Sequence, residues 1–256
     1  MAKVTPLRKQ YLEIKSKHPD AIVLFQLGDF YEAFDDDAKT VADELDVVLT
    51  SRPVAKEQRI PMAGVPCHAV EGYVARLIEK GYRVAIADQV DDTTSSGLVV
   101  RQVSRVVTPG TVVEPALLEE KQSNYLAAVV THETGAGLAY VDITTGEFVT
   151  TQLEGDEVEQ ELARIQPREC LVPERGRWKE GGDTSAHEGE APLPFRPERL
   201  GGGTHVTPLQ AYRFELGAAR QRLKDHFDVM TLDGFGCSGQ PLAIRAAGAI
   251  LHYLRE

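Results

Sequence analysis

The sequence has few cysteines and no long apolar run. Its 256 residues include three cysteines, Cys67, Cys170 and Cys237, with no C-x-x-C pair to suggest a zinc site or a redox centre. No stretch approaches the roughly 20 consecutive apolar residues of a membrane helix, and residues 1–6 form no apolar signal segment. We therefore expect a cytoplasmic protein that does not bind membranes.

Positive charge is also scarce. The chain has 28 Lys and Arg residues against 39 Asp and Glu residues, which gives a net charge of -11. Lys and Arg are the residues that neutralise nucleic-acid phosphates, so this balance argues against strong DNA binding by the chain alone. Because charge can be segregated on a surface, the balance does not exclude DNA binding as such.

Two kinds of site are missing. No G-x-x-x-x-G-K-[ST] loop occurs, and Gly201-Gly202-Gly203-Thr204 is not followed by the lysine of such a loop. His68, His132 and His252 lack the spacing of metal ligands. We expect no cofactor, no metal and no catalytic residue in this chain.

The first part of the sequence predicts a mixed α/β domain, residues 1–115. Its clearest element is the β-rich apolar run Ile22–Leu27, typical of a buried strand and ended by Gly28. A charged loop at 51–59 and a fixed extended turn at 61–66 are expected between the other elements. Those are helices at 6–17, 35–45 and 68–80 and strands at 82–87 and 99–107.

A second domain is expected at 124–256, after a linker at 116–123. Residues 125–130 and 137–149 predict a hairpin pair around Gly135. Residues 176–203 are dense in Gly, Pro, Glu and Arg without apolar periodicity, which predicts a mobile insertion. The other expected elements are helices at 157–165, 212–227 and 242–255 and a strand at 169–172, a layered α/β pattern.

The segment Gly28-Asp29-Phe30-Tyr31-Glu32-Ala33-Phe34 is the most informative one. It fits an ordinary strand end in which Phe30 and Phe34 pack inward while Asp29 and Glu32 face solvent. It also fits a strand that presents an aromatic ring and a carboxylate for binding. Taken alone, the segment does not decide between these interpretations.

A longer series of motifs resembles the MutS family of DNA mismatch repair proteins. The resemblance covers nearly the whole chain, and only the insertion after Pro173 departs clearly from it. The motifs recur in this order: Thr5-Pro6, Gly28-Asp29-Phe30-Tyr31-Glu32, Asp36-Asp37-Ala38, Leu49-Thr50-Ser51-Arg52, Ile60-Pro61-Met62-Ala63-Gly64-Val65-Pro66, His68-Ala69-Val70-Glu71-Gly72-Tyr73, Val107-Thr108-Pro109-Gly110-Thr111, Tyr140-Val141-Asp142-Ile143-Thr144-Thr145-Gly146-Glu147-Phe148 and Pro241-Leu242-Ala243-Ile244-Arg245-Ala246-Ala247-Gly248-Ala249-Ile250.

The resemblance implies that a Phe-x-Glu motif recognises mismatched or unpaired bases in duplex DNA, and the motif falls on Phe30 and Glu32. A mismatched pair stacks poorly, so an aromatic wedge that kinks the duplex from the minor groove costs less there than at a matched step. Phe30 would be this wedge. Glu32 would hydrogen-bond the displaced base, and its charge near phosphates would disfavour intact duplex.

The resemblance further implies lesser DNA contacts from Ser51, Arg52, Met62 and Arg101. For three of these residues, Arg52, Arg101 and Met62, an alternative without DNA contact remains open. Arg52 and Arg101 fit solvated surface charges, and Met62 fits a core filler.

The fold implied by the resemblance is a mismatch-recognition domain followed by a ribonuclease H-like connector domain without catalysis. Asp142, followed by Thr144, Thr145 and Gly146, matches the first acidic strand of ribonuclease H-like folds. A metal-dependent nuclease with Asp142 as a ligand is the alternative function. No partner acids are evident at the ends of later strands, which favours a structural turn.

The partners implied are mismatched double-stranded DNA, a MutL-type protein bound through the connector, and a second MutS copy in the full-length protein. The family carries its ATP and magnesium site in segments beyond the equivalent of Glu256, so we expect a fragment of a larger, nucleoid-associated protein. A MutS relative that acts in recombination or in translation quality control is disfavoured, because such relatives generally lack the Phe-x-Glu motif.

Overall fold

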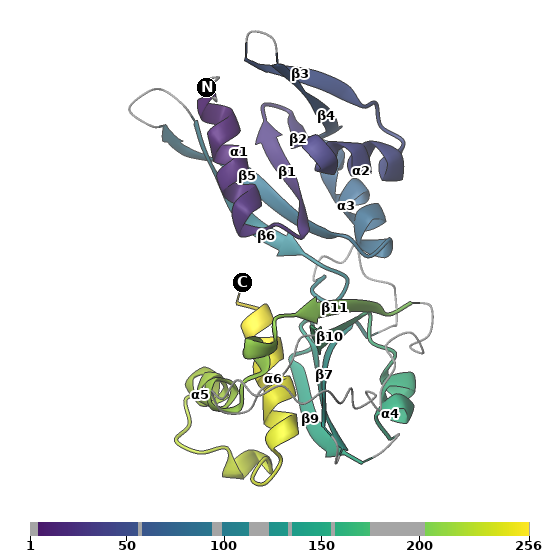
Figure 1. The fold of residues 1–256 in the computed structure, drawn as a ribbon, viewed down its shortest axis with the longest axis vertical. Coiled ribbons are helices and arrows are strands. Elements are labelled where there is room, and N and C mark those ends of the chain that lie inside the picture. The colour runs from purple at the N-terminus through teal and green to yellow at the C-terminus, as the bar shows by residue number, and fades with distance from the viewer. Residues whose placement is uncertain are drawn as a thin grey trace, which may run out of the picture. The chain divides into compact units, whose positions relative to one another are not determined.

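The computed structural model describes residues 5–55, 58–93, 99–112, 123–132, 135–154, 157–174 and 203–255. The chain divides into two compact units between residues 118 and 119, inside the segment expected to be a linker (Figure 1). Most of that linker, and the insertion predicted at 176–203 up to residue 202, lie outside the described residues. Within the described ranges, no helix has the length and apolar character needed to cross a membrane.

Unit 1 is built on a six-stranded sheet with the strand order β3-β4-β2-β1-β5-β6. Strand β1 runs parallel to β5, and the other neighbouring pairs are antiparallel. The elements are α1 (Pro6–Lys17), β1 (Ala21–Leu27), β2 (Phe30–Phe34), α2 (Asp35–Leu45), β3 (Thr50–Ala55), β4 (Gln58–Pro66), the 3-10 helix η1 (Cys67–Ala69), α3 (Val70–Glu79), β5 (Arg83–Thr93) and β6 (Val99–Val107).

Helices cover both faces of this sheet, because β1 is apolar at every position from Ala21 to Phe25 and needs burial on both sides. Helices α2 and α3 pack on one face. On the other face, Tyr11 of α1 meets Phe25 and Phe34 in edge-to-face contacts with ring centroids 5.9 and 4.9 Å apart. The predicted helices at 6–17 and 35–45 are confirmed.

The predicted loop at 51–59 and the predicted fixed turn at 61–66 are wrong, because both segments belong to strands. Strand β4 pairs with β3 on one side and β2 on the other, despite its two prolines, Pro61 and Pro66. Strand β3 is the edge of the sheet, and its pairing is irregular between Pro53 and Ala55. Pro53 lies on the edge strand at this irregularity and Pro66 is the last residue of β4, whereas Pro61 lies inside β4. Proline is tolerated at edges and irregularities, but the pairing at Pro61 is imposed by the neighbouring strands and was hidden by local composition.

Unit 2 contains a five-stranded sheet with the order β11-β10-β7-β8-β9. Strands β7, β8 and β9 are antiparallel, whereas β10 runs parallel to both β7 and β11. The elements are β7 (Tyr125–His132), β8 (Gly135–Asp142), β9 (Glu147–Leu153), α4 (Glu157–Ile165), β10 (Glu169–Pro173), β11 (His205–Leu209), the 3-10 helix η4 (Ala211–Phe214), α5 (Leu216–Phe227), the 3-10 helix η5 (Asp233–Phe235) and α6 (Pro241–Tyr253).

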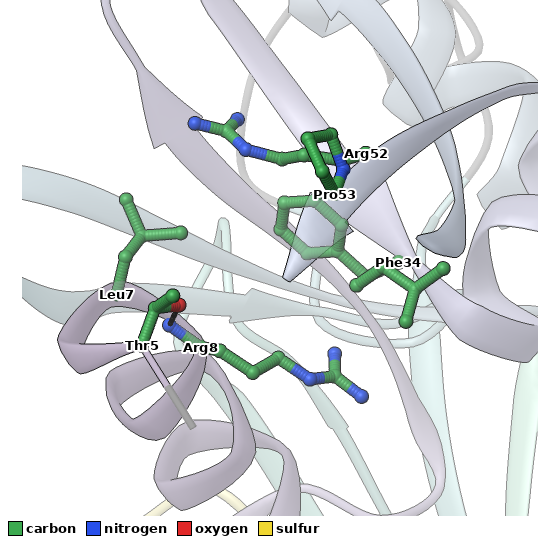
Figure 2. A pocket seen from close by; sticks show the side chains of 7 residues that line it. Thr5, Leu7, Arg8, Phe34, Arg52 and Pro53 are labelled. Carbon is green, nitrogen blue, oxygen red and sulfur yellow. Dashed lines mark hydrogen bonds between the residues drawn. The ribbon is translucent and has the colours of Figure 1, made fainter. Parts of the chain in front are cut away.

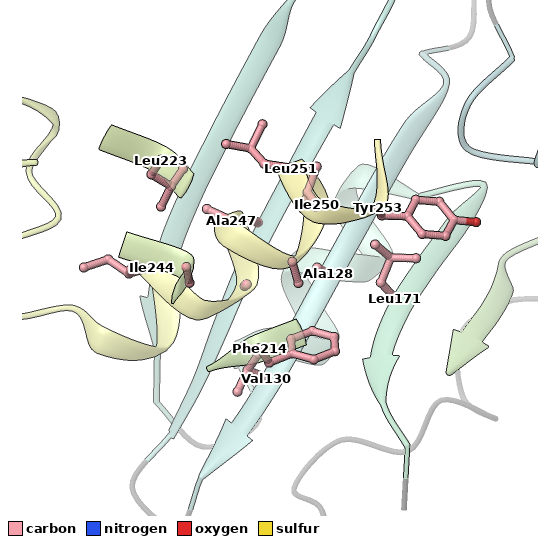
Figure 3. Packing of buried hydrophobic residues seen from close by; sticks show 14 of the residues in the cluster. Ala128, Val130, Leu171, Phe214, Leu223, Ile244, Ala247, Ile250, Leu251 and Tyr253 are labelled. Carbon is pink, nitrogen blue, oxygen red and sulfur yellow. The ribbon is translucent and has the colours of Figure 1, made fainter. Parts of the chain in front are cut away.

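The sheet of unit 2 is the middle of three layers. Helix α4 covers one face, and α5 and α6 cover the other, where residues of α6 pack on Ala128, Val130 and Leu171 (Figure 3). Helix α6 approaches β8 so closely that a Cβ on Gly137 would lie 2.1 Å from the carbonyl oxygen of Leu242. The apolar helix at 242–255 is confirmed as this buried layer, apart from its last residues.

Two predictions for unit 2 need correction. The single strand expected at 137–149 is two strands, β8 and β9, separated by a turn at 143–146. Strand β11 was not expected, because its sequence is short and contains Pro208. It forms because β10 offers a parallel partner, with Cys170 opposite Val206.

Candidate nucleic-acid interface

Phe30 and Phe34 stand at the two ends of strand β2 and have opposite environments. Phe34 is 1% exposed and lies in the aromatic cluster under α1, whereas Phe30 is 47% exposed. Phe30 begins the strand directly after the turn at Gly28, whose φ of +62° favours glycine. The interpretation in which both rings pack inward therefore holds for Phe34 only.

The register of the sheet places several predicted site residues on one face. Residues at alternate positions of a strand share a face, so Phe30, Glu32 and Phe34 point the same way. Glu32 lies opposite Gly64 of β4, and Arg52 of β3 lies opposite Ile60 of β4. Because Ile60 belongs to the core cluster of Phe34, Arg52 is on this face as well.

Gly64 forms the floor of this surface. A Cβ added to Gly64 would lie 3.6 Å from Cγ of Glu32 and 3.7 Å from Cδ1 of Phe30, which are ordinary contact distances. Both side chains therefore lie over a position that has no side chain of its own. We call this surface, made of Phe30, Glu32 and Arg52 over Gly64, the Phe30 face.

An ion pair joins the two charged residues of the Phe30 face. Nη1 of Arg52 donates to Oε2 of Glu32 over 2.6 Å. The Glu32 side chain is 15% exposed and that of Arg52 is 36% exposed, so the pair is only partly screened by water. The structure thus brings together Phe30, Glu32 and Arg52, which are spread over 22 positions of the sequence.

Arg101, by contrast, is used inside the unit. It is 9% exposed, and its guanidinium donates to the carbonyl oxygens of Gln26 (2.9 Å) and Val99 (2.6 Å) while lying 5.4 Å from the centre of the Phe25 ring. Burial, and then the nearby charge of Arg52, lower the pKa of Arg101. This geometry favours a structural role for Arg101 over a contact with DNA.

Two glutamines that the sequence analysis missed support the turn that precedes Phe30. The backbone N–H of Gln89 donates to the side-chain oxygen of Gln26 over 2.8 Å. With its amide oriented so that the oxygen faces donors, Gln89 accepts from Arg101 and from the backbone N–H of Gly28, each at 3.1 Å. Only the register of β1, β5 and β6 shows that these residues meet.

Ser51 and Met62 are less prominent than predicted. Oγ of Ser51 accepts a hydrogen bond from Nε of Arg59 over 2.8 Å, and Ser51, one position from Arg52, points to the opposite face of β3. Met62 is half-buried and packs against the core cluster under α1. This placement fits the filler interpretation of Met62, while part of its surface remains accessible.

A small cavity of about 20 Å³ lies between α1 and the strands beside the Phe30 face. Figure 2 shows Leu7 and Arg8 of α1, and Thr5 that caps this helix, across from Arg52 and Pro53 of β3. Such a volume has room for about one water molecule, so the cavity does not fit a nucleotide or a cofactor.

Asp142 of unit 2 is used in a turn. Its Oδ1 accepts from the N–H of Thr144 (2.9 Å), the hydroxyl of Thr144 (2.6 Å) and the N–H of Thr145 (3.4 Å). Among the residues that the structure describes, no three His, Cys, Asp or Glu side chains gather where they could hold a metal ion. The geometry favours the turn interpretation of Asp142 over the nuclease interpretation.

Comparison with known proteins gives matches over the whole chain. The family model described as MutS domain I matches residues 5–116, and MutS domain II matches residues 124–256. Proteins named DNA mismatch repair protein MutS are similar along all of this chain: 46% identical in Dehalococcoides mccartyi strain CBDB1, 47% in Symbiobacterium thermophilum and 48% in Syntrophobacter fumaroxidans. The chain spans 28% of the length of each of these curated relatives.

Proposed function

Since the chain belongs to the MutS family, we propose that it recognises mismatched or unpaired bases in duplex DNA through the Phe30 face. The observation that carries the proposal is that the Phe30 ring, 47% exposed, lies beside the Glu32 side chain over Gly64. A single exposed apolar side chain is common on a protein surface. Here the ring stands next to a carboxylate that can accept from the edge of a base, a combination that suits a wedge between bases.

The chemistry of the Phe30 face matches the task. An aromatic ring that enters beside a base must unstack it and kink the duplex, and both costs are lower where pairing is already faulty. The backbone under the ring is held by β1 on one side and by β4 on the other, with Phe30 opposite Leu27 and Pro66. A wedge that is held on both sides loses little conformational freedom on binding.

Glu32 supplies selectivity in this proposal. Its carboxylate, two positions from Phe30 on the same face, accepts a hydrogen bond from the edge of the displaced base. On an intact duplex no base is displaced, and the same carboxylate only meets the negative potential of the phosphates. The difference between these two situations disfavours matched DNA.

The test is Phe30→Ala, made in a chimera in which this chain replaces the matching segment of one of the full-length relatives. Titrations with a mismatched and a matched duplex should show that the preference for the mismatch is lost, because aromatic stacking contributes about 1–3 kcal/mol per base. Binding to matched duplex should persist through backbone contacts elsewhere.

Leu49→Ala is the matched control, because Leu49 is also an apolar residue of unit 1 and is 47% exposed. It should leave the preference unchanged. If Phe30→Ala retains the starting ratio of affinities, Phe30 is not the wedge.

We further propose that unit 2 binds a MutL-type protein. Support comes from an exposed apolar cluster in which the rings of Phe227 (38% exposed) and Phe235 (54%) are 5.2 Å apart, with the exposed Met230 (85%) between them in the sequence. The exposed carboxylates beside the cluster favour a partner segment with apolar anchors and Lys or Arg residues. These carboxylates belong to Asp225, Asp228 and Asp233.

Met230→Ser with Phe235→Ser should weaken capture of a purified MutL-type protein by the chimera on mismatched DNA. The control is Val206→Ser, which removes an apolar residue that is 36% exposed on β11. Equal capture by all variants would place the partner elsewhere. Dimerisation, ATP hydrolysis and work at the nucleoid are proposed for the full-length protein only.

We propose, finally, that this chain has no catalytic activity and binds neither ATP nor magnesium by itself. The support is the lack of a phosphate-binding loop in the sequence. Equilibrium dialysis with labelled ATP and a phosphate-release assay test the proposal. Turnover that survives a second purification would contradict it.

A further inference from the structure

We propose that Arg52 is a positioning residue for mismatch discrimination, which acts by holding the carboxylate of Glu32 over Gly64, beside the Phe30 ring. The inference rests on the proposed function of the Phe30 face. It assigns to Arg52 a role through Glu32 that is distinct from a contact with a DNA phosphate.

The first support is the geometry of the ion pair. Arg52 lies on the edge strand β3 and Glu32 on β2, with β4 between them, so their side chains reach toward each other across a whole strand. Glu32 lies opposite Gly64 of β4 and Arg52 lies opposite Ile60, so the guanidinium crosses β4 diagonally. Gly64 carries no side chain that would crowd the carboxylate at the end of this path. An arginine on this edge would otherwise be free to extend into solvent, yet Nη1 lies 2.6 Å from Glu32.

The second support is the way the carboxylate is occupied. Nη1 of Arg52 donates to Oε2 of Glu32, and no described residue donates to Oε1. A glutamate side chain has several rotamers, and the ion pair with Arg52 restricts the Glu32 side chain, which is 15% exposed, to those that reach the guanidinium. Fixing one oxygen leaves the other as the acceptor for a base, in a single orientation next to Phe30.

The third support is electrostatic. A lone carboxylate that approaches DNA meets repulsion from phosphates whether or not the duplex has a mismatch. Arg52 reduces the negative potential of this carboxylate without abolishing it, so the duplex can approach close enough for Phe30 to probe it. Arg101 does not replace Arg52 in this role, because its guanidinium donates to the backbone at Gln26 and Val99.

The alternative is that Arg52 serves only as a phosphate contact, and the two roles differ in what they change. Loss of a phosphate contact weakens binding to every duplex about equally and lowers the salt dependence of binding by about one counterion. Loss of a positioning residue reduces the ratio of mismatched to matched affinity. It does so only while Glu32 is present.

The experiment is a double-mutant cycle in the chimera with Arg52→Gln, Glu32→Gln and the double variant, titrated with mismatched and matched duplexes at several salt concentrations. We expect each single change to reduce the affinity ratio by about three- to tenfold, and the double change to reduce it no further, because coupled residues are not additive. Arg52→Lys should recover part of the ratio, since it keeps the charge but not the planar geometry.

Arg59→Gln is the matched control. Arg59 lies on the same β3–β4 hairpin and donates to Ser51, not to Glu32, so its loss removes a charge and leaves the ion pair. It should leave the affinity ratio unchanged. Thermal melting of each variant verifies that unit 1 remains folded, and Arg52→Lys provides a milder variant if Arg52→Gln does not fold.

Three results would overturn the inference. Equal losses on both duplexes, with additive effects of Arg52→Gln and Glu32→Gln, would make Arg52 a phosphate contact. A parent chimera without any preference for mismatches would instead remove the proposed function, and the inference with it. If the parent chimera prefers mismatches and Arg52→Gln keeps the same ratio of mismatched to matched affinity, only the role of Arg52 is contradicted.

Discussion

Gly64 in unit 1 and Gly137 in unit 2 are both strand glycines, but their surroundings differ. At Gly137 an added Cβ would meet the backbone of α6 at 2.1 Å, whereas at Gly64 the nearest atoms, 3.6 Å away, include a flexible side chain. In unit 2 the missing side chain allows two backbones to pack closely. In unit 1 it leaves a floor on which Phe30 and Glu32 rest. The same residue type thus serves stability in one unit and a surface site in the other.

The largest expected difference in stability is between substitutions of the two phenylalanines of β2. Phe34→Ala should lower the free energy of unfolding of unit 1 by about 3–5 kcal/mol, because it leaves a cavity in the aromatic cluster under α1. Phe30→Ala should change it by less than about 1 kcal/mol, as is usual for exposed positions. Urea unfolding followed by circular dichroism measures both, and equal losses would mean that Phe30 is part of the core.

The two glycines give the next effect. Gly137→Ala should destabilise unit 2 by about 1–3 kcal/mol, because α6 or β8 must shift to admit the methyl group. Gly64→Ala should leave the stability of unit 1 within about 1 kcal/mol, since a Cβ fits there at contact distance and alanine restricts the unfolded chain. A Gly137→Ala variant that unfolds at the parent's urea concentration would show that the close approach is relaxed in solution.

Asp142 tests whether unit 2 contains a turn or a metal site. Asp142→Ala should cost about 1 kcal/mol through the lost hydrogen bonds to Thr144 and Thr145, and Asp142→Asn less, since the amide oxygen still accepts. Neither change should affect magnesium-dependent DNA cleavage, which we expect to be absent from the chain and both variants. Cleavage by the chain that disappears in Asp142→Asn would restore the nuclease alternative.

The cysteines give the smallest effect, a difference in reaction rate. Burial raises the pKa of Cys170 to about 12 and also raises that of the half-buried Cys67. Because the thiolate is the nucleophile, alkylation near neutral pH should be slow for both and should accelerate as pH rises. Mass spectrometry should find Cys67 modified first and Cys170 only after unfolding. Early modification of Cys170 would indicate that unit 2 opens readily.

The helices and the buried strand β1 could be predicted from sequence because their signals are local. The apolar run at 22–27 and the periodicity of 35–45 need only a few neighbouring residues to be recognised. Strands β3 and β4 could not be predicted, since Pro61 and Pro66 read as turn residues until β2 supplies a partner.

At the Phe30 face, too, contacts between residues distant in the sequence could not be predicted. Phe30 and Glu32 are site candidates because of a short sequence motif, and their role stays a prediction, whereas the ion pair of Glu32 with Arg52 depends on a register that involves three strands. The burial of Arg101 was likewise hidden, because an arginine on a strand gives no sign of which face it occupies. Its distant partner, Gln26, is fixed only by the pairing of β6 with β5 and of β5 with β1.

Strand β2 also has a mechanical meaning. Phe30 is at its exposed end and Phe34 at its buried end, four residues or about 13 Å apart at the rise of an extended strand. In the proposed function, a duplex that resists bending would push back on the ring, and the force would pass along the strand to the Tyr11–Phe25–Phe34 cluster. The packing of this cluster would therefore set how firmly β2 holds Phe30. Small substitutions in the cluster should change the bend angle of the bound DNA and leave the residues that contact the DNA unchanged.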